Sequence, residues 1–142
     1  MTNNISLSFA VQKDAVALNL FDREAHKQMK WWGIRSKSEY QKLLTKGTRH
    51  RVILARHKSR LIGYLYARMK KKGRLWIEDV YVLPDYRKRR VAKTMLTKSL
   101  SIWKDIQSAS LLTPNKNIKI FNKMGFKRVM NYMSLTLKKG QK

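Results

Sequence analysis

The chain contains no cysteine. It therefore has no disulfide framework, no thiolate nucleophile and no cysteine ligands for a zinc finger. It also contains no uninterrupted apolar run of about 18 residues, so no segment predicts a transmembrane helix. Residues 1–11 show no cationic region followed by a long apolar stretch, and we therefore expect no signal peptide. The three histidines show no metal-ligand spacing, so no metal site is predicted.

Acidic residues are scarce too, with 8 Asp and Glu against 33 Lys and Arg and a formal net charge of +25. This charge is far larger than solubility requires, and it attracts polyanions over a long range. Nucleic acid is the first candidate partner, an anionic membrane surface or an acidic protein is the second, and a merely solvated basic surface is the alternative. We therefore expect an intracellular protein, in the cytoplasm or associated with the nucleoid or a nucleoprotein particle.

The positive charge is spread along the chain rather than gathered in a tail, so polyanion binding would use a folded surface. Lys70, Lys71 and Lys72 form a local peak of charge, and we predict that they contact nucleic acid. A folded core is expected because 43% of the 142 residues are apolar. The length suits one domain that spans residues 1–142.

Apolar periodicity predicts alternating strands and helices. Strands are expected over residues 5–11, 51–56, 61–69, 75–83 and 110–113, with one or two more within 126–137. Helices are expected over residues 14–30, 36–44, 89–106 and 114–123, and Gly125 would end the last of them. Ser36 and Glu39 have the spacing of a capping box. This order predicts a single-domain α/β fold, with a mixed central sheet of six to seven strands flanked by about four helices.

The segment from Trp76 to Leu96 is the most informative part of the chain. It reads as a buried strand, a turn at Pro84, a basic loop and an amphipathic helix. This order places backbone N–H groups and a helix N-terminus just beyond a strand end, which favours anion binding. The alternative is a basic loop that contacts only the phosphates of a nucleic acid.

The same segment closely resembles the acyl-CoA-binding motif of the GNAT N-acetyltransferase superfamily. In that motif a strand ends in V-x-P and Arg/Gln-x-x-Gly-x-Gly/Ala follows, whereas here the loop reads RKRRVA and has arginine at the first glycine position. Residues 114–126 resemble the family's late helix and its Tyr-x-Lys-x-Gly-Phe ending. The similarity spans residues 61–137, and the order of elements over the whole chain also resembles that of the family.

The resemblance implies a GNAT-like fold with acetyl-CoA as cosubstrate. In the family, the motif strand splays from its neighbour at a bulge, its backbone bonds the pantetheine arm, and the loop holds the pyrophosphate. The residues implied here are Val80, Tyr81 and Val82 for the arm, Arg87, Lys88, Arg89, Arg90, Val91 and Ala92 for the pyrophosphate, and Asn117 and Phe121 of the late helix. Since glycine lets a backbone approach phosphate closely, Arg90 would either displace the cofactor or hold it by charge.

Catalytic roles are also implied by the resemblance. Glu78 occupies the place of the strand glutamate that acts as a base through water, and the alternative is a structural ion pair. By strand alternation, Asp79 is expected on the opposite face of the sheet. The tyrosine that serves as general acid is replaced by Phe121, so Tyr132 or Tyr81 would have to substitute. Loss of such an acid typically lowers the rate by about 10²–10⁴-fold.

Two aromatic residues, Trp31 and Trp32, follow the first predicted helix, where family members form the acceptor-binding wall. Plain core packing is the alternative for this pair.

Three functions remain open. The first is an N-acetyltransferase that acts on an amine on or near a polyanion, either nucleic acid or a nucleic-acid-associated protein. A free polyamine is disfavoured as its acceptor because a strongly cationic protein repels it. The second is a catalytically silent GNAT-fold module that binds nucleic acid or serves structurally in a nucleoprotein assembly. The third is an interaction protein for an acidic partner.

Overall fold

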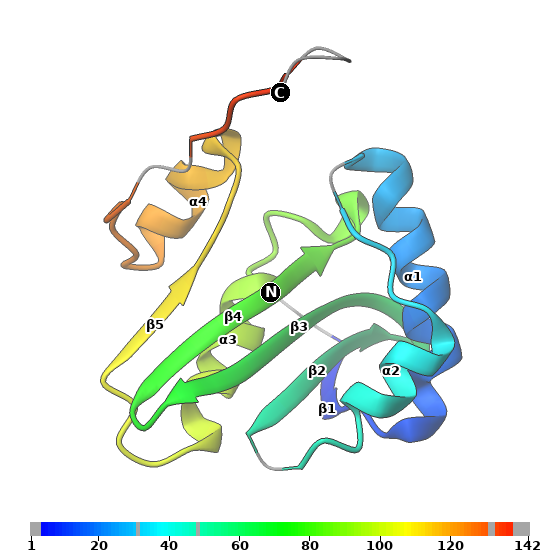
Figure 1. Cartoon of the computed structure of the whole chain (residues 1–142). Coiled ribbons are helices and arrows are strands. Elements are labelled where there is room, and N and C mark those ends of the chain that lie inside the picture. Colours follow the sequence, from blue (N-terminus) through cyan, green and yellow to red (C-terminus); the bar gives the residue numbers. More distant parts are fainter. Residues whose placement is uncertain (1–3, 31, 48, 131–132, 138–142) are drawn as a thin grey trace. The chain divides into compact units, whose positions relative to one another are not determined.

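The computed structural model describes residues 4–30, 32–47, 49–130 and 133–137 (Figure 1). The chain divides into two compact units, Met1–Leu112 and Thr113–Lys142. Within the described residues no helix is both long and apolar enough to cross a membrane.

The first unit contains a mixed sheet of five strands, β1 (Ile5–Phe9), β2 (His50–His57), β3 (Arg60–Lys71), β4 (Arg74–Val82) and β5 (Ser108–Leu111). The spatial order follows the sequence, β1-β2-β3-β4-β5. The first three pairs of neighbours are antiparallel, whereas β4 and β5 are parallel.

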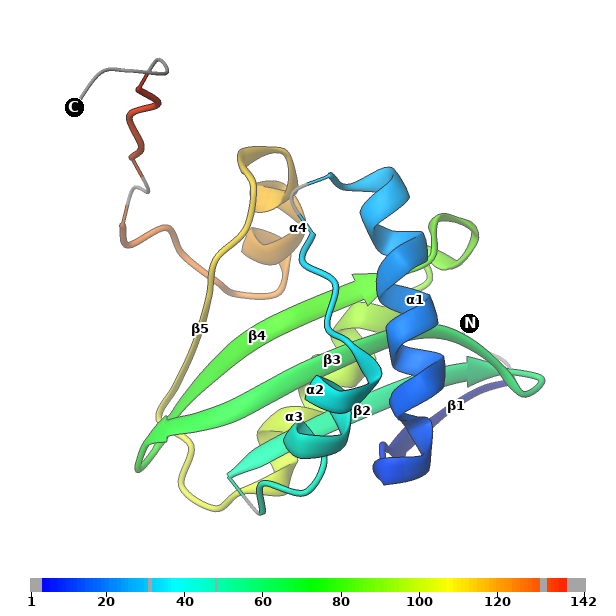
Figure 2. The ribbon, with the colours of Figure 1, turned by 45° about the vertical axis from the view of Figure 1, so that its right-hand side comes forward.

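Helices cover both faces of this sheet. On one face, α1 (Ala15–Gln28) and α2 (Lys37–Leu43) pack over a core formed with alternate residues of β2, β3 and β4. On the other face, α3 (Val91–Ile102) packs against β2, β3 and β4 (Figure 2). The capping box predicted at the start of α2 is confirmed, because Glu39 N–H donates to Ser36 Oγ over 3.1 Å and Ser36 N–H donates to Glu39 Oε1 over 3.2 Å.

The second unit contains a short turn of 3₁₀ helix (Asn115–Asn117) followed by α4 (Ile118–Lys123). Gly125 has a φ of +101°, a left-handed conformation that suits glycine, and it follows the C-cap residue Met124 as the sequence predicts. The Phe126 N–H then donates to the Phe121 carbonyl over 3.0 Å, which closes the helix end.

Two parts of the chain differ most from the sequence prediction. The predicted strands within residues 126–137 are wrong for the described residues 126–130 and 133–137, which form no strand, so the sheet has five strands rather than six to seven. An apolar pattern alone does not make a strand, because a strand also needs a hydrogen-bonded neighbour. The helix predicted over residues 89–106 ends at Ile102, because Trp103 adopts an extended conformation that cannot continue it.

Candidate functional site

A β-bulge interrupts β4 at Glu78. Tyr66 of β3 lies opposite Asp79, whereas the next residue, Ala67, lies opposite Ile77, so Glu78 is the extra residue on β4. A bulge of this kind bends the strand and redirects side chains, and bulges are frequent next to active sites. The resemblance implied a bulge in this strand, and the structure has one at Glu78.

The bulge places Glu78 and Asp79 on the same face of the sheet. Tyr66 of β3 belongs to the core on the α1/α2 face, and Asp79 lies directly opposite it. Arg68 lies two residues after Tyr66 and therefore points to the same face. Glu78 forms an ion pair with Arg68, so it lies on this face as well. The expectation that Asp79 points to the opposite face is therefore wrong. Simple alternation assumes a regular strand, and the extra residue cancels it at this point.

Each carboxylate is paired with an arginine. Arg68 Nε donates to Glu78, and Arg35, in the connection between α1 and α2, donates through a terminal nitrogen to Asp79. The Asp79 side chain is 19% exposed and that of Glu78 is 26% exposed. Burial raises the pKa of Asp79, and the Arg35 guanidinium opposes that shift.

A buried carboxylate on α1 positions Arg35. Asp22 is fully buried and accepts four hydrogen bonds, from Trp32 Nε1 at 3.1 Å, the Arg35 N–H at 3.0 Å, the Tyr40 hydroxyl at 2.7 Å and the Tyr64 hydroxyl at 2.8 Å. Because these donors come from the connection, from α2 and from β3, Asp22 ties three segments together beside Asp79. Trp32 is part of this core, so its side chain packs inside the protein; Trp31 lies outside the described residues.

The sequence reasoning did not single out Asp22, although a signal existed. Asp22 lies one helical turn after Leu18 and beside Phe21 on the apolar face of the predicted helix. A charged residue at such a position is rarely buried unless it is paired. Arg35 and Arg68 carried no comparable signal, because they are two among many basic residues.

The parallel pairing of β4 with β5 ends where the bulge begins. Ile77 is paired with Leu111, and β4 then continues to Val82 without a strand partner on that side within the described part of the first unit. The outward backbone groups of Val80 and the N–H of Val82 are therefore available to an extended ligand. Tyr81 does not face this edge, because its backbone points toward β3, its ring is buried and its hydroxyl donates to Gln28 of α1.

The loop after β4 has the backbone of an anion site. Lys88 and Arg90 have φ angles of 65° and 62°, both left-handed, and Arg90 directly precedes α3. No side chain caps α3, so its first-turn N–H groups, at Val91 and Ala92, remain for an anion. Arg90 thus adopts the conformation that the pattern's glycine adopts most easily, at a cost of about 1–2 kcal/mol.

Two arginines of this loop are held by aromatic rings. Arg87 Nε donates to the Val82 carbonyl over 2.9 Å, and its guanidinium carbon lies 5.2 Å from the centroid of the Tyr81 ring. Arg89 lies 5.3 Å from the Tyr86 ring centroid, and the Tyr86 hydroxyl bonds His57 Nδ1 over 2.8 Å. The loop is therefore fixed to β4 and to the end of β2.

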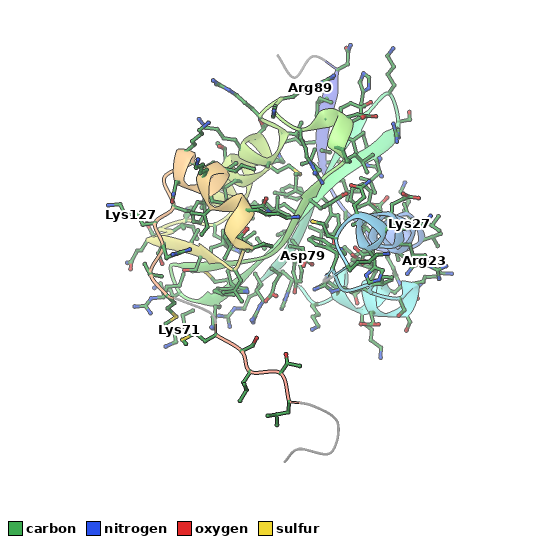
Figure 3. The ribbon with its side chains drawn as sticks, turned by 90° about the horizontal axis from the view of Figure 1, so that it is seen from above. Arg23, Lys27, Lys71, Asp79, Arg89 and Lys127 are labelled. Carbon is green, nitrogen blue, oxygen red and sulfur yellow. The ribbon has the colours of Figure 1, made fainter. Side chains whose placement is uncertain are left out.

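Further residues were predicted for cofactor binding, for catalysis and for nucleic-acid binding. Asn117 begins α4, and the Phe121 ring packs edge-on against Phe126 at 5.9 Å between centroids, both within the second unit. Tyr132 lies outside the described residues. Lys70, Lys71 and Lys72 are exposed at the β3–β4 hairpin. Figure 3 labels Lys71 at the hairpin and Arg89 in the loop, with Asp79 between them.

A cavity of about 440 Å³ lies along α1, between this helix and the exit of β4. It does not include Glu78 or the loop of residues 87–92. Its lining residues are Ala17, Leu20, Phe21, Glu24, Gln28, Arg60, Leu61, Leu83, Pro84 and Asp85.

The chain matches the model of the acetyltransferase (GNAT) family over residues 16–126. A comparison with curated proteins finds no match. Among solved structures, the chain is similar to an aminoglycoside acetyltransferase from an uncultured soil metagenomic sample, at 16% identity and a TM-score of 0.75, covering 96% of this chain and 98% of that chain.

Two further solved structures have a similar fold. The glucosamine-6-phosphate N-acetyltransferase from Arabidopsis thaliana is 15% identical with a TM-score of 0.72, and 94% of this chain and 99% of that chain are covered. The ribosomal-protein-alanine N-acetyltransferase from Brucella melitensis biovar Abortus 2308 is 14% identical with a TM-score of 0.67 over the same shares. At these identities the likeness shows the fold.

Proposed function

Because the chain belongs to the acetyltransferase (GNAT) family, whose members use acetyl-CoA as acetyl donor, we propose that it transfers an acetyl group to an amine on or near a polyanion. One observation carries the enzymatic part of the proposal. The bulge at Glu78 coincides with the end of the β4–β5 pairing, so a carboxylate lies beside an open strand edge that leads to an anion-binding loop.

The residues present fit acetyl-CoA. Of the residues Val80, Tyr81 and Val82, the backbone groups of Val80 and the N–H of Val82 face the open edge and suit the amides of a pantetheine arm. The left-handed loop before α3 suits a pyrophosphate. The cations of residues 87–90 add charge-assisted hydrogen bonds to phosphate oxygens. When bound there, the cofactor supplies an activated acetyl group.

Glu78 is the proposed base. Acetyl transfer requires the acceptor amine to be neutral, and a carboxylate next to the open strand edge can accept the ammonium proton through a water molecule. The ion pair with Arg68 fixes the position of the Glu78 carboxylate. Phe121 has no proton to donate, and Tyr132 remains the proposed acid.

Charge supports the choice of acceptor. A protein with a net charge of +25 raises the local concentration of polyanions and repels small cationic amines. An amine on a nucleic acid, or on a protein bound to one, therefore fits the field of this protein better than a free polyamine. Lys70, Lys71 and Lys72 remain the proposed nucleic-acid contacts.

Calorimetry with the purified full chain tests the cofactor site. We expect CoA to bind, and we expect the substitutions Arg87→Ala and Lys88→Glu to weaken binding by removing an anchored cation and reversing a charge in the loop. Lys104→Ala, beyond the end of α3, is the matched control and should bind CoA as the wild type does. Absence of binding at millimolar CoA would overturn the proposal.

The second candidate is a catalytically silent GNAT-fold module. Such a module would bind nucleic acid, serve structurally in a nucleoprotein assembly or bind an acidic protein. It is favoured by Phe121, which replaces the usual acid of the family. Binding of CoA without acetylation of any amine, under conditions where nucleic acid also binds, would favour this candidate over the enzyme.

A further inference from the structure

A row of basic and aromatic side chains extends from Glu78 along the α1/α2 face of the sheet toward the β3–β4 hairpin. The register places His50 beside Arg68 and Arg68 beside Trp76, so three neighbouring strands contribute one side chain each. Lys70 joins them, since its Nζ lies 5.2 Å from the centroid of the Trp76 ring. We call His50, Arg68, Lys70 and Trp76 the basic row.

The basic row lies where the cover of α1 and α2 ends. Val52 and Tyr66, the preceding pair on this face, belong to the core under these helices, whereas the side chains of the basic row are half-buried or exposed. On the other side of β4, the neighbour of Trp76 is Ser110 of β5, which is exposed and too small to cover an indole. Part of the row therefore reaches solvent.

Arg68 keeps binding capacity although it is paired with Glu78. The pair uses Nε, and neither terminal nitrogen of Arg68 has a partner among the described residues. The side chain is 37% exposed, so these nitrogens can meet a ligand. Guanidinium N–H groups in this fork match the geometry of phosphate oxygens.

The surroundings of the basic row are cationic. Burial lowers the pKa of His50, and the nearby cations Lys46, Arg68 and Arg49 lower it further. His50 Nδ1 also bonds the Tyr66 hydroxyl over 2.7 Å, which fixes the ring. Toward the hairpin tip the row continues into three exposed cations, Lys71, Lys72 and Arg74. An anionic chain lying along β3 and β4 would therefore meet positive charge from the tip to Glu78.

We infer that the basic row binds single-stranded nucleic acid, with an unpaired base stacked on Trp76 and phosphates bound by Arg68 and Lys70, and that this strand brings the acceptor amine to Glu78. The statement about the acceptor rests on the proposed function, whereas the docking does not. A single strand fits because an indole can stack only on a base whose face is free, and in a duplex the base faces are covered.

Fluorescence anisotropy with the full chain and no acetyl-CoA tests the docking. The probes are a labelled mixed-sequence DNA strand of about ten nucleotides and the same sequence as a duplex. We expect tighter binding of the strand. Trp76→Ala should weaken strand binding by about fivefold or more, with a smaller effect on the duplex, whereas Trp76→Phe keeps an aromatic face and should retain most of the affinity.

The chain offers a matched control on a different part of the sheet. Lys98 lies 5.0 Å from the Phe9 ring centroid, between α3 and β1, and so reproduces the lysine–aromatic pair outside the basic row. Lys70→Ala should weaken strand binding more than Lys98→Ala, although both remove one charge. Three results would overturn the inference. The first is an equal loss of strand affinity in Lys70→Ala and Lys98→Ala. The others are duplex binding as tight as or tighter than strand binding, and an unchanged strand affinity in folded Trp76→Ala. Displacement of the strand by polyglutamate as readily as by unlabelled strand would also overturn it, in favour of an acidic protein.

Acetylation is measured separately, so the two proposals can fail independently. Glu78→Gln should bind the strand at least as tightly as the wild type, because it removes a negative charge beside Arg68, and it should transfer no acetyl group to an amine on the strand. Strand binding through the basic row without acetyl transfer by the wild type would remove the enzymatic proposal and leave the docking. If the wild type transfers acetyl groups but Trp76→Ala and Lys70→Ala leave the strand affinity unchanged, the proposed docking on the basic row would be wrong.

Discussion

Arg68 and Glu78 form an ion pair between neighbouring strands at the point where a bulge disturbs their register. The bulge gives Glu78 no cross-strand partner of its own, and Arg68 fills that role from a position opposite Trp76. One arginine thus orients the proposed base and also belongs to the basic row.

Glu78→Gln should lower kcat by about 10²–10⁴-fold, because glutamine cannot accept a proton from the acceptor. CoA binding should be unchanged, since the loop of residues 87–92 is not altered. Steady-state kinetics and calorimetry measure the two effects. Glu39→Gln, in the capping box of α2, is a control that removes a carboxylate away from the site. Full activity in Glu78→Gln would assign the base role to another group.

Asp22→Ala should destabilise the fold by roughly 3 kcal/mol or more, because it leaves two tyrosine hydroxyls, an indole N–H and a backbone N–H buried without their acceptor. Urea unfolding measures this loss. Glu24→Ala, in an exposed pair with Lys27 on the same helix, should change stability by less than about 1 kcal/mol. Similar losses in the two variants would contradict the role given to Asp22.

Arg90→Gly and Arg90→Val should differ in CoA binding. Glycine adopts the left-handed conformation freely, so the loop keeps its backbone and loses one charge. Valine is branched at Cβ and opposes a positive φ more strongly than arginine does, so it should disturb the loop, lower stability and weaken CoA binding further. Calorimetry and thermal unfolding test both variants. Equal CoA affinity in the two variants would show that CoA binding does not depend on the left-handed conformation at position 90.

Phe121→Tyr should raise kcat, since it restores the hydroxyl that the family's late helix carries in the resembling motif. The expectation rests on the resemblance, and the rate at saturating acetyl-CoA measures it. Phe126→Tyr, a change to the ring that packs against Phe121, is the matched control. A fall in kcat for Phe121→Tyr with normal stability would contradict the expectation.

Stability should fall as the pH falls through the range just below about 6.5, the ordinary histidine pKa. Because burial and nearby cations lower the pKa of His50 in the folded state, the unfolded chain takes up this proton first. The contribution of His50 is therefore fully present above the unfolded pKa and is lost as the pH drops through the folded value. His50→Gln should flatten that part of the profile in urea unfolding at pH 5 to 7.5, and an unchanged slope would argue against the shift.

Replacing Lys70, Lys71 and Lys72 together by alanine should lower the salt dependence of nucleic-acid binding without unfolding the domain. Each phosphate contact contributes about 0.9 to the slope of log K against log salt on duplex DNA and about 0.7 on single strands. The three lysines are exposed, so their loss should change stability little. Affinity that stays flat from low to high salt in the wild type would exclude the nucleic-acid reading.

Much of the first unit was predictable because local signals agree with the fold. Periodicity located β2, β3, β4 and the helices to within a few residues, and Ser36 with Glu39 marked the start of α2. The family resemblance implied a bulge in this strand but not its position, because Ile77, Glu78 and Asp79 are compatible with a regular strand and only the pairing with β3 identifies Glu78 as the extra residue. The strands predicted within residues 126–137 are wrong for the described residues 126–130 and 133–137, because strand pairing depends on neighbours distant in the sequence, which a local pattern does not reveal.

The short β4–β5 pair has a consequence for the order in which the sheet assembles. The four residues of β5 pair with residues of β4 that lie 34 positions earlier in the sequence, whereas β2, β3 and β4 follow one another through tight hairpins. Closing a long connection for few hydrogen bonds is slow and weakly rewarded, so β5 should dock late in folding and open first in the native protein. Amide hydrogen exchange should therefore be faster in β5 than in β3. A ligand that spans the open edge beside Ile77 would slow amide exchange in β5. The exchange rate of this late-folding strand would therefore report on ligand binding.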